Sequence, residues 1–170
     1  MRGSGRGVGT DLRASLPVPR SAEFEAFVDS DGCRLRRALV ARFGVDVGNE
    51  VTNDALAHAW SQWATVGVMS NRVGYLYRVG QSAARRYWRW RRGVVLAEVD
   101  DRGELDRYDD GLFDALGGLN HEQRVAVLLV HGYGYSYADV ADVLGVSVAA
   151  VTNHVHRGLG SLRKKMGGGR

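Results

Sequence analysis

From residue 21 to residue 92, apolar side chains recur at steps of three and four, the spacing of one buried helix face. The first helix predicted from this spacing is lined by Phe24, Phe27, Val28, Leu35, Leu39 and Phe43, and it stops at Gly44. A second helix is predicted after a short polar gap, with Val51, Ala55, Ala59, Trp60 and Trp63 on its inner side. Its polar positions Glu50, Asp54 and His58 are spaced four residues apart and are predicted to form an outer acidic stripe.

A third predicted helix, residues 71–92, combines seven arginines and no acids with five tyrosine and tryptophan rings. Leu76, Val79, Ala83, Tyr87 and Trp90 can face a core, and Arg78, Arg85, Arg89 and Arg92 then share one helical face. A row of guanidinium groups binds phosphates, and rings beside it can stack on unpaired bases for about 1–3 kcal/mol per base. The segment therefore predicts a nucleic-acid surface; the alternative is a core of rings beneath solvated arginines.

The end of the chain predicts a helix-turn-helix. Asn120 can cap a helix that carries Val125, Leu128 and Leu129 and is closed by Gly132 and Gly134. Ser136 and Asp139 mark the start of a short helix with Val140, Val143 and Leu144 inside, and Gly145 supplies the turn. Ser147 caps the last helix, whose predicted inner stripe is Val148, Val151, Val155, Leu159 and Leu162. The outward positions are then Ala149, Ala150, Asn153, His154 and Arg157, followed by Arg163, Lys164 and Lys165, side chains that can reach base edges and phosphates.

These elements predict an all-α protein with two small helical domains joined by an acidic linker. Both prolines, Pro17 and Pro19, precede the first helix, so every later segment is free to be helical. We divide the 170 residues into a disordered basic arm (1–20), a first helical domain (21–92), the acidic linker (93–111), a second helical domain (112–166) and a short tail (167–170).

The distribution of charge is more informative than the net charge of +4. Residues 70–92 carry a net +7, residues 93–111 carry −5, and residues 146–170 carry +5. Two basic segments separated by an acidic one are the pattern expected of a protein with two separate nucleic-acid contacts.

The sequence gives little support for disulfides, metal binding, catalysis or membrane insertion. Cys33 stands alone, which excludes a disulfide framework and a thiol zinc site. The five histidines are scattered, and His154 and His156 do not share a helix face, so we expect no metal, no cofactor and no enzymatic activity. The longest apolar stretch, Val125–Val130, is far shorter than the roughly 20 residues of a membrane span, and no signal segment opens the chain. We therefore expect a cytoplasmic protein without membrane insertion.

Over about residues 21–166, these segments resemble the extracytoplasmic-function (ECF) group of bacterial sigma-70-family RNA polymerase sigma factors. The stretch Asp54–Trp60 is similar to the core-binding helix of the family's region two, and Asn71–Gly80 is similar to its promoter-melting and minus-ten segment. Leu119–Arg124, Tyr135–Val151 and the pair His156-Arg157 resemble region four.

The resemblance implies a factor that directs promoter recognition, promoter melting and transcription initiation by core RNA polymerase. Its partners would be core RNA polymerase and promoter DNA, with an anti-sigma factor as a further candidate. The polymerase would be bound by Glu50, Asp54, His58 and Trp60. The minus-ten element would be held and melted by Asn71, Arg72, Tyr75, Arg78, Arg85, Arg86, Trp88 and Arg89. The upstream element would be read by Ser147, Ala149, Ala150, Asn153, His154, Arg157, Arg163 and Lys164.

The alternative function is a stand-alone helix-turn-helix transcriptional regulator, in which the first domain senses or binds another molecule. Such a regulator would bind duplex DNA tightly without polymerase, at paired half-sites.

Overall fold

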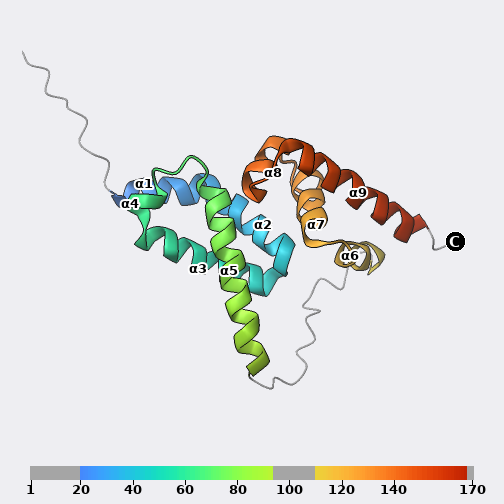
Figure 1. Ribbon diagram of the computed structural model, residues 1–170, viewed down its shortest axis with the longest axis horizontal. Helices are drawn as coiled ribbons and strands as arrows, with labels where there is room; N and C mark the ends of the chain where they lie inside the picture. Colours follow the sequence, from blue (N-terminus) through green and yellow to red (C-terminus); the bar gives the residue numbers. More distant parts are fainter. Residues whose placement is uncertain (1–19, 94–109, 168–170) are drawn as a thin grey trace, which may run out of the picture.

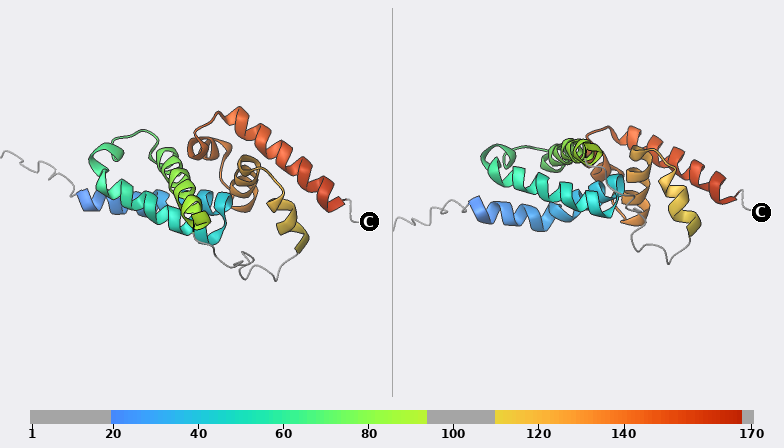
Figure 2. Two further views of the ribbon diagram at one scale, coloured as in Figure 1. Left: turned by 60° about the horizontal axis from the view of Figure 1, so that its bottom comes forward. Right: turned by 90° about the horizontal axis from the view of Figure 1, so that it is seen from below.

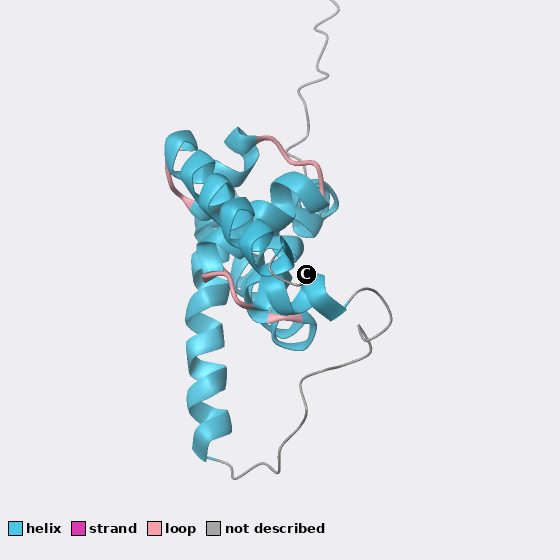
Figure 3. Cartoon of the chain, turned by 90° about the vertical axis from the view of Figure 1, so that its right-hand side faces the viewer, coloured by secondary structure: helices cyan, strands magenta, loops and turns pink. Residues whose placement is uncertain are grey.

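The computed structural model describes residues 20–93 and 110–167, with side chains described for residues 20–87 and 111–167. Every regular element in these two stretches is helical (Figure 3), which confirms the all-α prediction. The predictions for the basic arm and the acidic linker concern mainly residues 1–19 and 94–109, which lie outside the described residues. Arg20 and residues 110–111 already belong to helices.

Residues 20–93 form five α-helices, ordered along the sequence as Figure 1 shows. They are α1 (Arg20–Phe27), α2 (Cys33–Phe43), α3 (Val45–Ser61), α4 (Trp63–Val66) and α5 (Arg72–Gly93). A π-helical turn, Val28–Gly32, joins α1 to α2, so the single helix predicted up to Gly44 is one continuous run with a wider turn in its middle. The C-terminal half of α5 extends away from the other helices (Figures 1 and 3).

Gly44 and Gly48 allow α2 and α3 to pack closely. Gly44 ends α2 with a φ of +85°, a conformation that glycine adopts without steric cost, and α3 begins at the next residue. The predicted polar gap is therefore this single residue. A Cβ on Gly48 would lie 2.5 Å from the Cα of Val40, so the two backbones touch at this point.

We expect Gly48→Ala to lower the free energy of unfolding by about 1–2 kcal/mol, because pushing the two helices apart outweighs the roughly 1 kcal/mol that alanine gains in a helix. Urea denaturation checks this. Gly160→Ala is the matched control, since a Cβ at Gly160 meets nothing within 4 Å, and it should raise the free energy by up to about 1 kcal/mol. Equal stability of the two variants would contradict the proposed packing.

An aromatic cluster holds α1 against α3 and α4. The Phe24 ring centroid lies 5.2 Å from each of the rings of Trp60 and Trp63, and the Phe27 ring lies 5.4 Å from Trp63. Trp63 is buried as predicted, but the prediction that Trp60 faces inward is wrong, since it is 48% exposed. Trp60 follows Val51 by nine residues, which is two and a half helical turns, so it lies on the opposite side of α3.

The described residues 110–167 form four α-helices, and most of their predicted caps are confirmed. They are α6 (Asp110–Gly117), α7 (His121–Val127), α8 (Tyr137–Leu144) and α9 (Val148–Gly167), and a π-helical turn (Leu128–Gly132) extends α7. The Asn120 side chain accepts a hydrogen bond of 2.9 Å from the Gln123 amide and so caps α7. A small buried cluster, Ala115, Leu119, Val127 and Leu162, holds α6 and α7 against the end of α9.

The two halves pack against each other and share one core. Leu35 and Leu39 of α2 belong to the same continuous buried cluster as Val125, Leu129 and Val140 from the second half. The two views of Figure 2 show α2 and α7 side by side. The structure therefore joins the two predicted domains into one body.

A polar group of α7 residues closes one end of this seam. Arg124 donates hydrogen bonds of 3.0 Å to the carbonyls of Ala41 and Arg42, and Arg42 pairs with Glu122 at 3.2 Å. Arg124 also lies 2.9 Å from Nδ1 of His121, which must be neutral to accept this hydrogen bond. Burial, and then the charges of Arg42 and Arg124, lower the pKa of His121 below its usual 6.5.

The lowered pKa of His121 predicts that the free energy of unfolding decreases as the pH falls. The His121 pKa is lower in the folded chain than in the unfolded chain, so the unfolded chain binds more protons as the pH falls below about 6.5. We therefore expect a lower urea midpoint at pH 5.5 than at pH 7.5. His121→Gln keeps an acceptor for Arg124 but cannot be protonated, so it should lose part of this pH dependence. An unchanged pH dependence in the variant would exclude His121 as its source.

Candidate nucleic-acid interface

Helices α8 and α9 form a helix-turn-helix with well-satisfied ends. The Ser136 hydroxyl accepts from the Asp139 amide, and the Asp139 carboxylate accepts from the Ser136 amide, which is a complete capping box. The Ser136 hydroxyl and then Arg34 hold the pKa of Asp139 below its usual value, although burial opposes them. Gly145 makes the turn at a φ of +67°, and Ser147 caps α9 by accepting from the Ala150 amide at 3.2 Å.

The free face of α9 carries most of the residues predicted to contact DNA. Ser147, Ala149, Asn153, Arg157, Arg163 and Lys164 are exposed, whereas Ala150 and His154 are half-buried at the side of the helix. Val151, Val155 and Leu162 are buried as predicted, and Leu159 is half-buried. The prediction that Val148 is buried is wrong: it is 47% exposed at the first residue of α9.

Two exposed side chains on this face, Thr152 and His156, are absent from the predicted contact residues. His156 follows Ala149 by seven residues and Asn153 by three, so it lies on the same side of α9. The spacing itself could have identified His156.

The arginine face of α5 is present as far as its side chains are described. Arg78 and Arg85, seven residues apart, are both exposed on one face, and Arg86 is exposed beside them. The side chains of Trp88, Trp90, Arg89 and Arg92 lie outside the described residues. Leu76 and Ala83 are buried as predicted, while Val79 and Tyr87 are half-buried. Tyr77 is also buried, and burial raises its pKa, an effect that Arg42 partly offsets.

The N-terminal end of α5 gathers Asn71, Arg72 and Tyr75. The Asn71 side chain caps the helix by accepting from the Gly74 amide at 2.7 Å. The Arg72 guanidinium lies 5.2 Å from the centre of the Phe27 ring. A hollow of about 600 Å³ opens here, lined by Arg20, Glu23, Trp63, Ala64, Gly67, Val68 and Arg72.

The predicted acidic stripe of α3 lies along its seam with α5 and not on a free outer face. His58 is half-buried, and its Nε2 atom lies 2.9 Å from the Tyr75 hydroxyl. Asp54 pairs with Arg86 of α5 at 3.0 Å. Four residues turn an α-helix by about 40° more than one full turn, so each residue of the stripe lies about 40° further around α3 than the one before it. His58, the last of the three, therefore faces α5. Glu50 and Asp54 remain exposed at the edge of a groove of about 280 Å³ between the two helices.

No group of three or more His, Cys, Asp or Glu side chains in residues 20–93 and 110–167 is arranged to hold a metal ion. Among the helices described, none has the length and apolar character needed to cross a membrane.

Comparison with known proteins gives matches in sequence and in fold. The family model "Sigma-70, region 4" matches residues 110–162, which span α6 to α9. The RNA polymerase sigma-E factor of Streptomyces coelicolor is 30% identical over 124 residues, covering 69% of this chain and 70% of the relative. The sigma-E factor of Streptomyces antibioticus is 28% identical over 124 residues, covering 69% of each chain.

Two solved structures share the fold. The sigma factor RpoE of Bartonella quintana, solved with the anti-sigma factor NepR, matches 87% of this chain and 99% of its own, with a TM-score of 0.59 and 22% identity. CnrH, solved with the cytosolic domain of CnrY, matches 86% of this chain and 89% of its own, with a TM-score of 0.57 and 26% identity. The chain therefore belongs to the ECF group of the sigma-70 family of RNA polymerase sigma factors, a family of initiation factors and not of enzymes.

Proposed function

We propose that three surfaces of this sigma factor divide the work of initiation. In this proposal α9 reads the upstream promoter element, the start and arginine face of α5 hold the separated minus-ten strand, and α3 docks on core RNA polymerase. The observation that carries the proposal is that one chain presents a capped helix-turn-helix and, on a different helix, a second exposed basic face. A stand-alone regulator needs only the first of these.

The side chains in the N-terminal half of α9 suit contacts with bases, and those near its C-terminus suit contacts with phosphates. Ala149 is small and allows the backbone to approach the major groove. Asn153 can bond an adenine edge through both amide atoms, and Arg157 can do the same with guanine. Arg163 and Lys164, two turns further on, are exposed cations suited to phosphates.

The start of α5 suits unpaired DNA. Arg78 and Arg85 present charge to the phosphate backbone, and Arg72 and Arg20 add cations around the hollow beside Trp63. A hollow of this size, walled by an aromatic ring and cations, can receive a base that has left the duplex stack.

The outer part of α3 supplies the docking surface in this proposal. Trp60 is half exposed, and exposed tryptophans are typical of protein interfaces. Glu50 and Asp54 add negative charge at the neighbouring edge. His58 is turned toward α5, so in this proposal it supports the docking surface through its contact with Tyr75 and does not contact the polymerase itself.

The proposed role in initiation also bears on catalysis, cofactors, cellular location and protein partners. We propose that the chain itself catalyses no reaction, needs no metal or cofactor, and acts in the cytoplasm, where polymerase and promoters are found. The two structural neighbours were solved with protein partners, one of them named an anti-sigma factor, and we propose that this chain also has an anti-sigma partner.

The experiment that tests the proposal is co-elution with core RNA polymerase in size-exclusion chromatography. We expect the wild-type chain to co-elute, and we expect Asp54→Arg to bind at least ten-fold more weakly, because it reverses a charge on the docking edge. Asp46→Arg is the matched control, since Asp46 is an exposed acid of the same helix outside the docking residues.

Two results would contradict parts of this proposal. Normal binding by Asp54→Arg would move the docking surface away from α3. Separate elution of a folded wild-type chain that still binds duplex DNA would favour the stand-alone regulator.

A further inference from the structure

We propose that the N-terminal end of α9 selects thymine, and that Val148 and Thr152 make apolar contacts with thymine methyl groups in the major groove. Val148 is the first residue of α9, and Thr152 follows it by four residues. The inference rests on the proposed function of α9 as the reader of the upstream element. It adds the kind of base that this end of the helix would recognise.

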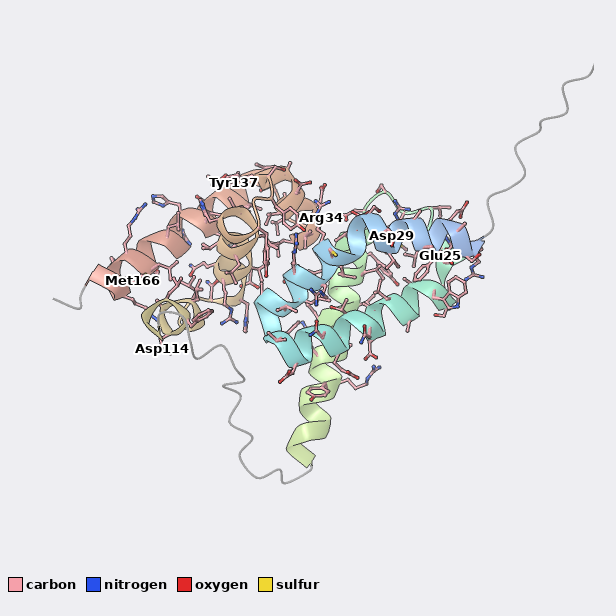
Figure 4. The ribbon with its side chains drawn as sticks, turned by 180° about the vertical axis from the view of Figure 1, so that it is seen from behind. Glu25, Asp29, Arg34, Asp114, Tyr137 and Met166 are labelled. Atoms are coloured by element: carbon pink, nitrogen blue, oxygen red, sulfur yellow. The ribbon has the colours of Figure 1, made fainter. Side chains whose placement is uncertain are left out.

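The first observation is an exposed apolar patch where α9 begins. Val146, in the turn of the helix-turn-helix, is 40% exposed, and Val148 is 47% exposed. Thr152 is exposed on the same side of α9 as Val148, because residues four apart are neighbours on a helix. In Figure 4 the helix runs from this end, beside α8, to Met166 near its C-terminus. The patch therefore lies at the end of α9 that adjoins the turn.

The second observation is that the hydroxyl groups at this end of α9 are bonded within the helix. The Ser147 hydroxyl accepts from the Ala150 amide at 3.2 Å. The Thr152 hydroxyl donates to the Val148 carbonyl at 3.0 Å. Because the hydroxyl proton of Thr152 is used in this way, its methyl group is the part of the side chain that remains to contact a partner.

The third observation is the distribution of cations along α9. Residues 146–156 contain no lysine or arginine, whereas Arg157, Arg163 and Lys164 follow and are exposed. The beginning of the helix therefore has little to attract a phosphate, and it presents apolar contact area instead. Asn153 supplies the first side-chain amide after this patch.

Thymine is the base that an apolar patch can recognise in the major groove. Its C5-methyl group is apolar, whereas the other bases present hydrogen-bond donors and acceptors there. A valine against one of those polar groups would displace water without replacing its hydrogen bond, which costs free energy. A valine or threonine methyl group against a thymine methyl group buries apolar surface on both sides. Recognition helices contact base edges through their N-terminal residues, which is where Val148 and Thr152 lie.

The test removes thymine methyl groups from the DNA without changing base pairing. The full wild-type chain selects its preferred duplex from a random library, and a second duplex carries deoxyuridine in place of every thymine. Fluorescence anisotropy then gives both affinities for the wild type and for a double variant, Val148→Ala with Thr152→Ser. Thr152→Ser removes the methyl group and keeps the hydroxyl. Circular dichroism checks that the variants fold.

Val45→Ala is the matched control. Val45 is 49% exposed and is the first residue of α3, so it has nearly the same exposure and helix position as Val148 on a helix outside the proposed reader.

We expect the wild type and Val45→Ala to bind the deoxyuridine duplex roughly 4- to 15-fold more weakly than the thymine duplex, the loss for one or two buried methyl groups. The double variant should bind the two duplexes with affinities within about two-fold of each other, because it lacks the methyl groups that meet thymine.

Equal binding of the two duplexes by the wild type overturns the inference, and this comparison needs no variant. A selected site without A·T pairs also overturns it. So does an undiminished thymine preference in the double variant, since the methyl groups would then act through the shape of the duplex. If the double variant also fails to co-elute with core polymerase while keeping that preference, the patch binds a protein.

The selection step separates this inference from the proposed function. If a duplex is preferred but its thymine methyl groups do not matter, the inference alone fails. If no duplex is preferred over random sequence, the proposed function of α9 fails, and the inference fails with it.

Discussion

Leu39→Ala should lower the free energy of unfolding by about 3–5 kcal/mol, the upper part of the range for a buried leucine. Leu39 is fully buried, and its two methyl groups lie against Gly80 of α5, where a Cβ would be 2.8 Å away. The glycine has no side chain that can move into the space left by the leucine, so the cavity should persist. The loss is a large fraction of the 5–15 kcal/mol that stabilises an ordinary domain.

Urea or thermal unfolding measures this effect, and 3 kcal/mol corresponds to a fall in melting temperature of about 6–12 °C for a chain of this size. Leu112→Ala provides the matched control, because Leu112 is 37% exposed on α6 and should lose less than about 1 kcal/mol. Similar losses in the two variants would mean that Leu39 does not pack as described.

Asn153→Ala should weaken binding to the preferred upstream element by roughly 5- to 150-fold, the loss of about 1–3 kcal/mol for one two-bond contact to a base. The preferred duplex can be selected from a random library with wild-type protein, and affinities can then be compared by anisotropy. Binding to unrelated duplexes should change little, because the amide carries no charge to attract phosphates.

Arg163→Ala is the comparison variant for Asn153→Ala. Arg163 is exposed on α9 ten residues after Asn153, where it suits a phosphate and not a base. We expect it to weaken all duplexes alike and to reduce the salt slope by about 0.9, the value for one phosphate contact. If both variants lose affinity equally on all sequences, α9 binds DNA without reading it.

The helices and their caps were predictable because local chemistry decides them. Gly44, Gly145, Asn120 and Ser136 end or begin helices through their own backbone freedom or side-chain acceptors. The helix-turn-helix follows from such local features alone, and so does most of the exposed row on α9.

The wrong predictions for Trp60, His58 and Val148 have three different physical causes. Trp60 was placed inside because tryptophan is apolar, although its position on α3 is opposite to Val51. The four-residue spacing from Glu50 and Asp54 predicts an outward His58, but the drift of that spacing around α3 directs its side chain to Tyr75. Val148 has the correct register but lies at the end of α9, where little covers it.

Packing between the halves could not be predicted from any local pattern. Arg34 and Asp139 are 105 residues apart, and neither residue has a spacing that identifies the other. Asn71 was predicted to face DNA, and the same amide chemistry suits the Asp142 carbonyl equally well. Polar groups able to bind DNA are also able to bind the protein itself, and only the fold decides between them.

The π-helical turn at Val28–Gly32 holds one residue more than an α-helical turn would, because its hydrogen bonds span five residues and not four. Deleting one residue from this turn should therefore restore a regular α-helix, with Phe24 and Phe27 still against Trp63 and Leu39 still against Gly80. The same deletion within α2 should rotate one part of the run against the other by about 100° and separate the two sets of contacts. The π turn thus marks a position at which the length of this helical run can change while both packing contacts are kept.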